Sequence, residues 1–273
     1  MTRRFFSQST LLALTSIVVF LFTQESAHAA PAPKIGAKRA MVIDYDTGRI
    51  LYEKNAHQKC AVASTQKLLT AICVLDAGST KNKVKVQKTD TYCEPTKLYI
   101  SPGEVYTRYD LTKALVVKSG NDLARALARD VSGSQAGFAR YMNKKARQMG
   151  MKNSNFINPN GLTAKGQYST AYDVAILARN AYSRPTLRAF MKNKGYYFKY
   201  PNGKKAYLKN TNRLLKSLPF CTGMKTGTTR ASGRCLVCSG TLNGRTVIVV
   251  CLGATSQTIW KDSERLLRWG LKN

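Results

Sequence analysis

The sequence predicts an α+β domain, with an antiparallel sheet built from both ends of the chain and a helical lobe inserted between them. Strand-like segments with turn signals occur near the start and near the end of the chain, and helix-like segments lie between them. The chain has 273 residues and is 44% hydrophobic, which is enough for one large domain with an ample core. No internal repeat, low-complexity segment or long linker divides it.

The first elements are a hairpin and a buried helix. Residues 39–44 (RAMVID) and 49–53 (RILYE) have the composition of strands, and residues 45–48 (YDTG) form the turn between them. A helix is predicted over residues 64–77 and ends at Gly78. Its apolar residues occupy most of its circumference, which is typical of a buried central helix.

The middle of the chain is mainly helical, with helices expected over residues 110–117, 121–130, 135–149 and 170–181. We place the helical lobe at about residues 79–200. Strands return at residues 234–240 and 246–252, which flank an Asn-Gly turn and therefore form a hairpin. An amphipathic helix over residues 263–271 closes the chain.

The first 29 residues have the composition of a signal peptide. Arg3 and Arg4 form a charged start, residues 11–22 are almost wholly apolar, and residues 27–29 (AHA) give a small-residue cleavage site. The apolar run is short for a membrane span. We therefore expect export to the periplasm or another extracytoplasmic part of the cell envelope, and a single mature domain over residues 30–273. An uncleaved anchor is the alternative.

The net charge of +30 is large and is spread over the whole length. A charge of this size attracts polyanions. For an exported protein these would be anionic envelope polymers or lipid head groups. We expect no nucleic acid partner, because the sequence has no nucleic-acid-binding motif. A basic surface that only reflects compositional bias is the alternative.

Seven cysteines follow the signal segment, and an odd number leaves at least one thiol unpaired. Cys235 and Cys238 have the spacing of a metal-binding pair, but no second pair accompanies them. In a strand, moreover, positions three apart point to opposite faces. We expect no metal and no cofactor, and either buried free thiols or one or two disulfides.

Histidine occurs only at His28, which lies in the predicted signal segment, and at His57. A serine hydrolase with a histidine base would therefore depend on His57 alone. A hydrolytic serine in this chain would therefore use a lysine as its base. That lysine must be neutral near pH 7, although its unperturbed pKa is about 10.4. Burial, the positive end of a helix dipole and a second cation all lower the pKa of a lysine.

Three short motifs fit a serine hydrolase with a lysine base. Residues 64–67 (STQK) put a serine and a lysine on one face of a helix, about one turn apart. Residues 119–121 (SGN) connect two helices, and residues 225–229 (KTGTT) lead into the C-terminal strands. Each motif alone has an ordinary structural explanation, such as helix capping by Ser64 or Ser119. The presence of all three in this order favours catalysis.

On these motifs the sequence resembles the D-alanyl-D-alanine carboxypeptidases, serine-type low-molecular-weight penicillin-binding proteins with a β-lactamase/transpeptidase-like fold. The middle motif SGN is the form typical of the carboxypeptidase branch. Longer strings agree at residues 63–71 (ASTQKLLTA), 118–124 (KSGNDLA), 156–162 (FINPNGL) and 223–229 (GMKTGTT). The resemblance implies an antiparallel sheet flanked by N- and C-terminal helices.

The resemblance also implies catalytic roles. Ser64 would be the acylated nucleophile and Lys67 the general base that takes its proton. Ser119 and Asn121 would complete the proton and substrate network, with Asn121 binding the peptide backbone. Lys225 would sustain the positive field that lowers the pKa of Lys67.

Substrate-binding roles follow in the same way. Thr226 would hold the terminal carboxylate, and the backbone N–H groups of Ser64 and Thr228 would form the oxyanion hole. Gly227 lacks a Cβ, so the substrate could lie along its strand as an added edge strand. Asp173 matches a family aspartate near the site.

The implied function is a serine D,D-carboxypeptidase that removes the terminal D-Ala from peptidoglycan stem peptides and is inhibited by β-lactams. A D,D-endopeptidase has the same motifs and stays open. A class A β-lactamase deacylates with a glutamate between the second and third motifs, and residues 122–224 contain none. A non-catalytic, basic envelope-binding protein is the alternative outside the enzymes, and the intact motifs argue against it.

The chain departs from the family pattern at several positions. Val62 stands where a proline is usual, and Thr228 replaces a common histidine. Relatives place a carboxylate-binding arginine before the last helix, whereas no arginine occurs here between residues 245 and 265. Lys261 is the candidate to replace it. Because the chain stops at Asn273, we expect no β-rich second domain and no C-terminal amphipathic anchor.

Overall fold

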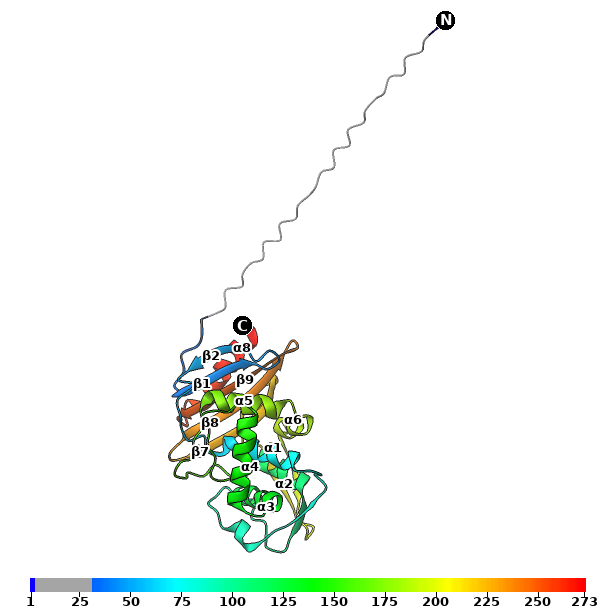
Figure 1. Ribbon diagram of the computed structural model, residues 1–273, viewed down its shortest axis with the longest axis vertical. Coiled ribbons are helices and arrows are strands. Elements are labelled where there is room, and N and C mark those ends of the chain that lie inside the picture. The colour runs from blue at the N-terminus through cyan, green and yellow to red at the C-terminus, as the bar shows by residue number, and fades with distance from the viewer. Residues whose placement is uncertain (3–30) are drawn as a thin grey trace.

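The structure, a computed structural model, describes residues 1–2 and 31–273, so residues 3–29 of the predicted signal segment lie outside the described residues. A five-stranded sheet forms one half of the domain and a helical lobe the other (Figure 1). The strand order is β2-β1-β9-β8-β7, and every neighbouring pair is antiparallel. The predicted α+β class is confirmed. The strands are β1 (Arg39–Asp44), β2 (Ile50–Lys54), β7 (Cys221–Thr229), β8 (Gly233–Leu242) and β9 (Arg245–Ala254).

Alternate residues of the central strands face two separate cores. The smaller core lies between the sheet and α8 (Ile259–Lys272), and the larger one lies between the sheet and the helical lobe. Strand β9 gives Ile248, Val250 and Leu252 to the larger core and Val247, Val249 and Cys251 to the smaller one.

The cysteines follow this strand periodicity. Cys235 and Cys238 lie on opposite faces of β8, one in each core, as the sequence predicts. All seven cysteines are unpaired, and five of them are buried. Within residues 1–2 and 31–273, no three His, Cys, Asp or Glu side chains form a group that could hold a metal ion.

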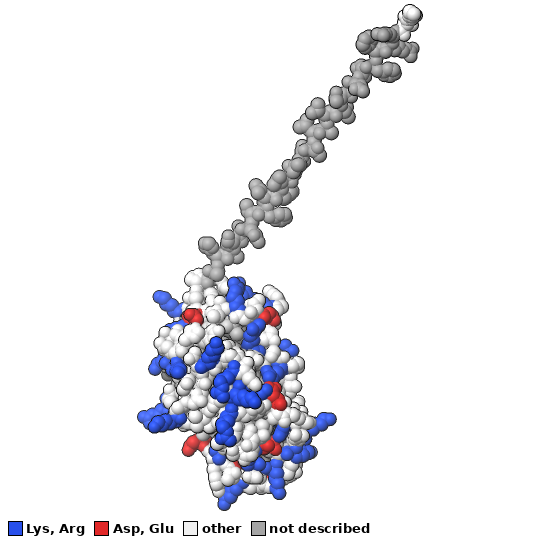
Figure 2. Space-filling view, in the orientation of Figure 1, with Lys and Arg blue, Asp and Glu red and all other residues white. Residues whose placement is uncertain are grey.

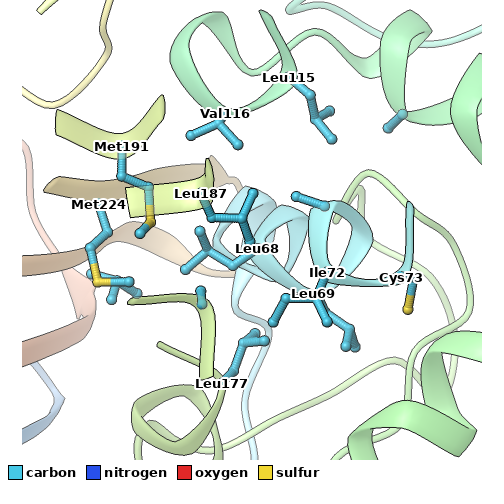
Figure 3. Close-up of a cluster of buried hydrophobic side chains, with 14 of the residues drawn as sticks. Leu68, Leu69, Ile72, Cys73, Leu115, Val116, Leu177, Leu187, Met191 and Met224 are labelled. Atoms are coloured by element: carbon cyan, nitrogen blue, oxygen red, sulfur yellow. The ribbon is translucent and has the colours of Figure 1, made fainter. Parts of the chain in front are cut away.

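Helix α1 (Lys67–Asp76) runs through the middle of the lobe, and its residues 67–74 are all buried. Leu68, Leu69 and Ile72 are surrounded by side chains from other helices and from β7 (Figure 3). The predicted buried central helix is confirmed. The other helices are α2 (Arg108–Lys118), α3 (Asn121–Ser132), α4 (Gln135–Gln148), α5 (Ala171–Tyr182), α6 (Pro185–Lys192) and α7 (Leu214–Ser217).

The ends of two helices differ from the prediction. The segment predicted as a helix from residue 64 begins with a 3₁₀ turn, η1 (Ala63–Gln66), and the α-helix starts only at Lys67. Ser64 therefore lies on a tight turn and caps no helix with its side chain. The last helix starts at Ile259 and not at Ser263.

Several short elements were not predicted, because their sequences are lysine-rich or too short to show a period. These are β3 (Lys83–Lys85), η2 (Lys88–Thr91), β4 (Val105–Thr107) and α6, together with the hairpin of β5 (Gly195–Lys199) and β6 (Lys205–Lys209).

Candidate active site

A pocket of about 280 Å³ opens where η1, β7 and the connection between α2 and α3 meet. All three predicted motifs contribute to it, although they are far apart in the sequence. Ser64, Ser119, Asn121 and residues 226–229 line its wall, and no acidic side chain does so. The fold thus brings the predicted catalytic residues into one site.

A strained and closely packed turn positions Ser64. Ala63 has a φ of 49°, at the edge of the left-handed region that residues with a side chain seldom adopt. A Cβ on Gly227 would lie 2.8 Å from the backbone N of Ser64 and 3.0 Å from that of Thr65. A Cβ on Gly161 would overlap the carbonyl group of Ala63. The protein itself therefore uses the space left by Gly227, which is a reason the sequence did not reveal.

Lys67 is fully buried behind Ser64. Its Nζ lies 2.7 Å from Ser64 Oγ, 2.7 Å from Asn121 Oδ1 and 2.6 Å from the backbone O of Asn160. The two amide oxygens can only accept hydrogen bonds, whereas the Ser64 hydroxyl can also donate one. A neutral amine has two N–H groups and one lone pair. It can therefore donate to both amide oxygens and accept from Ser64.

The surroundings favour this neutral form. Burial is the main cause that holds the pKa of Lys67 well below its ordinary value, and the charge of Lys225 is the second. Lys225 is also fully buried, and burial lowers its pKa to about 7. In the described part of the chain, neither lysine forms a salt bridge. The two amines thus supply a proton acceptor beside Ser64 and a second cation near it.

Ser64 has a second hydrogen-bond partner. Its Oγ lies 3.2 Å from the backbone O of Asn160 and can donate to it. A protonated Lys67 can then donate one hydrogen bond to each of its three oxygen neighbours. Both protonation states of Lys67 are therefore satisfied by the same heavy-atom positions.

Ser119 and Asn121 link the two lysines to the pocket wall. Lys225 Nζ donates to Ser119 Oγ at 2.9 Å. Asn121 Nδ2 donates to the backbone oxygens of Glu94 at 2.8 Å and Pro95 at 3.2 Å, which turns its Oδ1 towards Lys67. Both ends of the Asn121 amide are engaged within the protein, so binding of a substrate backbone would need one of these bonds to open.

Two residues considered from the sequence lie outside the pocket wall. Asp173 is buried in the first turn of α5, where its carboxylate accepts from the backbone N of Asn153 at 2.8 Å and from Ser154 Oγ at 2.6 Å. It fastens this loop to the helix and does not line the pocket. Lys261 is exposed on α8 and does not line the pocket either.

Two arginines that the sequence did not single out line the pocket instead, Arg213 and Arg234. Arg234 on β8 donates from Nη1 to Thr228 Oγ1 at 3.2 Å on the neighbouring strand. Arg213 lies over the ring of Trp260, with its Cζ 5.4 Å from the ring centroid. Strand register and loop packing place them here, so no motif marks them. Asn160, in contrast, lies in the FINPNGL string, which did carry a signal.

Comparison with known proteins agrees with this geometry. The profile of the Peptidase_S11 family, D-alanyl-D-alanine carboxypeptidase, matches residues 24–256. The chain belongs to this family. The D-alanyl-D-alanine carboxypeptidase DacF of Bacillus subtilis is 37% identical over 239 residues, which are 86% of this chain and 60% of that protein. DacC of Escherichia coli is 34% identical over 281 aligned positions, which cover 96% of this chain and 68% of that protein.

A solved structure shows the same fold. The crystal structure of D-alanyl-D-alanine carboxypeptidase from Mycobacterium tuberculosis superposes with a TM-score of 0.86 at 29% identity, over 90% of this chain and 95% of that one. The β-lactamase/transpeptidase-like fold and the family predicted from the motifs are therefore confirmed. This member of the Peptidase_S11 family spans about 60% of the length of its Bacillus subtilis relative.

Proposed function

We propose that this member of the Peptidase_S11 family is a serine-type D,D-carboxypeptidase, a hydrolase that removes the terminal D-Ala from peptidoglycan stem peptides. The observation that carries this proposal is the distance of 2.7 Å between Lys67 Nζ and Ser64 Oγ. The lysine is buried and has no counter-ion among the described residues, and its pKa is held low beside Lys225. This arrangement fits a nucleophile with its general base.

The reaction follows from these contacts. Ser64 Oγ attacks the carbonyl carbon of the penultimate D-Ala, and its proton moves to Lys67 Nζ. The backbone N–H groups of Ser64 and Thr228 stabilise the negative oxygen that forms. The peptide bond then breaks as the proton held on Lys67 Nζ passes, with Ser119 as the relay, to the amine of the leaving D-Ala. Water attacks the resulting ester of Ser64, which releases the shortened peptide and restores the serine.

We assign the terminal carboxylate of the substrate to Arg234, together with the hydroxyls of Thr226 and Thr228. A guanidinium can hold a carboxylate through two parallel hydrogen bonds. Arg234 lines the pocket and forms no salt bridge in the described part of the chain. Arg234→Ala should raise KM much more than it lowers kcat, and Arg234→Lys should restore part of the affinity. An unchanged KM in both variants would rule Arg234 out.

Labelling with a fluorescent penicillin tests the nucleophile. We expect a long-lived adduct on Ser64 that is absent from Ser64→Ala, because residues 122–224 offer no glutamate for rapid deacylation. Lack of an adduct on the folded wild-type protein would exclude the acyl-enzyme mechanism. Release of D-alanine from a peptide ending in D-Ala-D-Ala, without cleavage of cross-linked peptides, then separates carboxypeptidase from endopeptidase.

The place of action follows from the substrate. Peptidoglycan lies outside the cytoplasm, so we propose export by the signal segment 1–29 to the periplasm, and a single catalytic domain over residues 30–273. Within the described residues, no helix is both long and apolar enough to cross a bilayer. Binding to anionic envelope polymers belongs to the same proposal. High salt should release the mature protein from cell envelopes, and resistance to salt would count against it.

A further inference from the structure

The hairpin of β5 and β6 presents an unusual outer face. Tyr197 and Tyr207 lie directly opposite each other on the two strands, with ring centroids 5.2 Å apart at an interplanar angle of 62°. They are 71% and 55% exposed. Phe198 and Leu208, the next residues along, point inward and are buried. The two aromatic rings are therefore mostly exposed to solvent and contribute little to the core.

Lysines flank these rings at both ends. Lys199 lies directly opposite Lys205, and Lys209 lies opposite Gly195, on the face that carries the tyrosines. Like charges directly opposite each other destabilise a strand pair. These three lysines are exposed and form no salt bridge in the described part of the chain.

No acidic neighbour in the sequence offsets these charges. Residues 174–261 contain no aspartate and no glutamate. Figure 2 shows that basic side chains also outnumber acidic ones over the visible face of the molecule. The hairpin thus combines an aromatic surface with lysines that have no ion-pair partner among the described residues, although Glu104, Asp110 and Asp122 of neighbouring elements act on Tyr196 and Tyr200 from the buried side.

The hairpin lies beside the mouth of the catalytic pocket. Thr211, two positions after the end of β6, lines the pocket and accepts a hydrogen bond of 2.7 Å from Thr226 Oγ1. Tyr200 in the turn of the hairpin donates from its hydroxyl to the backbone O of Leu98 at 3.1 Å. This segment continues from Pro95 and Thr96, which line the pocket as well. A long molecule on the hairpin could therefore extend to Ser64.

We propose that this face, which we call the tyrosine–lysine platform (Tyr197, Lys199, Lys205, Tyr207 and Lys209), binds the glycan strand that carries the stem peptides. The C–H groups of a sugar ring stack well on the electron-rich face of an aromatic ring. Carboxylates of the attached peptides would pair with the lysines. A polyphosphate without sugar rings would make no use of the tyrosines. This inference rests on the proposed function and adds a second contact for the polymeric substrate.

The test compares a soluble peptide ending in D-Ala-D-Ala with polymeric peptidoglycan. Tyr197→Val with Tyr207→Val keeps strand-forming side chains but removes the flat rings. We expect KM for the polymer to rise about tenfold, with unchanged kcat/KM for the soluble peptide. Tyr197→Phe with Tyr207→Phe keeps the rings and should behave like the wild type.

A matched pair of variants tests the lysines. Lys199→Gln with Lys205→Gln should weaken polymer binding and reduce its salt dependence. Lys144→Gln with Lys272→Gln removes the same charge from exposed sites on α4 and α8 and should have no effect. An equal loss in this control would overturn the proposal, since it would show a general effect of net charge.

Two further results would contradict the platform. The first is an unchanged KM for the polymer in the valine variant. The second is an equal loss on both substrates, which would mean that the hairpin only supports the pocket. Sedimentation of the wild-type and valine-variant proteins with insoluble peptidoglycan measures binding without catalysis. It therefore tests the platform even if the soluble peptide is not cleaved and the proposed reaction is wrong.

Discussion

Asp122 and Lys67 are both completely buried. Asp122 follows Asn121 in the sequence, and Lys67 Nζ lies 2.7 Å from Asn121 Oδ1, but the surroundings of the two charged groups differ. The carboxylate of Asp122 accepts from the backbone N–H groups of Leu98 at 2.9 Å and Tyr99 at 2.7 Å. It also lies in the first turn of α3, where the helix dipole favours a negative charge. Lys67 has hydrogen-bond partners but neither a counter-ion among the described residues nor a favourable dipole.

This difference separates a structural charge from a reactive one. The carboxylate of Asp122 fixes residues 98–100, which follow Pro95 and Thr96 of the pocket wall in the sequence. Lys67 has no ion-pair partner in the described part of the chain, and burial and the charge of Lys225 outweigh the attraction of Asp122, so its amine gives up its proton readily. The same small region of the fold therefore contains one charge that stabilises the structure and one amine that can gain or lose a proton.

Replacing the reactive lysine should have the largest effect. Lys67→Met removes the proposed general base, so we expect acylation by penicillin and release of D-alanine to fall by about 10⁴-fold. The fold should persist, because methionine fills the space without a buried amine. Stopped-flow acylation and circular dichroism measure the two effects. Activity that survived in this variant would mean that another group takes the proton from Ser64.

The same variant also tests the energetic argument. The pKa of Lys67 is lowered in the folded state, so at neutral pH the unfolded wild-type chain binds more protons than the folded one. Wild-type stability should therefore rise as pH increases towards the unperturbed lysine pKa of about 10.4. The free energy of unfolding of Lys67→Met, measured with urea, should rise less with pH than that of the wild type. An equal rise in both proteins would contradict a lowered pKa of Lys67 in the folded state.

Replacing the structural charge should affect stability more than chemistry. Asp122→Asn keeps the shape but loses the charge that accepts several backbone hydrogen bonds, so we expect a loss of about 3 kcal/mol in the free energy of unfolding. The matched variant Asp110→Asn, at an exposed site in the first turn of α2, should lose much less. Urea denaturation measures both. Equal losses would show that burial of Asp122 adds nothing.

Gly227→Ala should disturb the nucleophile through the backbone. The new Cβ would meet the backbone N of Ser64 at 2.8 Å and that of Thr65 at 3.0 Å, so β7 and η1 must move apart. We expect a loss of about 2 kcal/mol in stability and a marked fall in acylation rate. Gly203→Ala, in the turn of the β5–β6 hairpin, gives the contrasting case: nothing lies near its Cβ, and any loss there comes from a positive φ that Gly227 does not have. Full activity of Gly227→Ala would contradict the close packing.

The pH dependence should show the smallest and most specific effect. Activity should be highest when Lys67 is neutral and Lys225 is charged, so kcat/KM should rise as Lys67 loses its proton and decline as Lys225 loses its own near its pKa of about 7. Lys225→Met removes one cause of the low pKa of Lys67. The rising limb should then move to higher pH, and the falling limb should disappear. An unmoved rising limb would show that the two amines do not interact.

The sequence revealed those parts of the site that depend on residue type and local spacing. Ser64, Lys67, Ser119, Asn121 and Lys225 could be found because each lies in a short motif, and the fold does bring them together. Strand periods likewise predicted which sheet faces carry Cys235 and Cys238.

Features that depend on tertiary approach could not be found in this way. Arg234 reaches the pocket through the register of β7 and β8, and Arg213 through a loop packed on Trp260. The close contact of Gly161 with Ala63 joins segments distant in the chain, and no local pattern records it. The 3₁₀ turn under Ser64 was missed for the same reason.

The sheet itself has a consequence for how the chain folds. Strand β1, from the start of the domain, pairs with β9, which ends only at Ala254. A chain that leaves the ribosome with its N-terminus first therefore cannot complete its central strand pair until residues 245–254 have been made. Pairings between such distant segments also form slowly. A long-lived unfolded state of this kind is what passage through a membrane before folding requires, in keeping with the export that we propose.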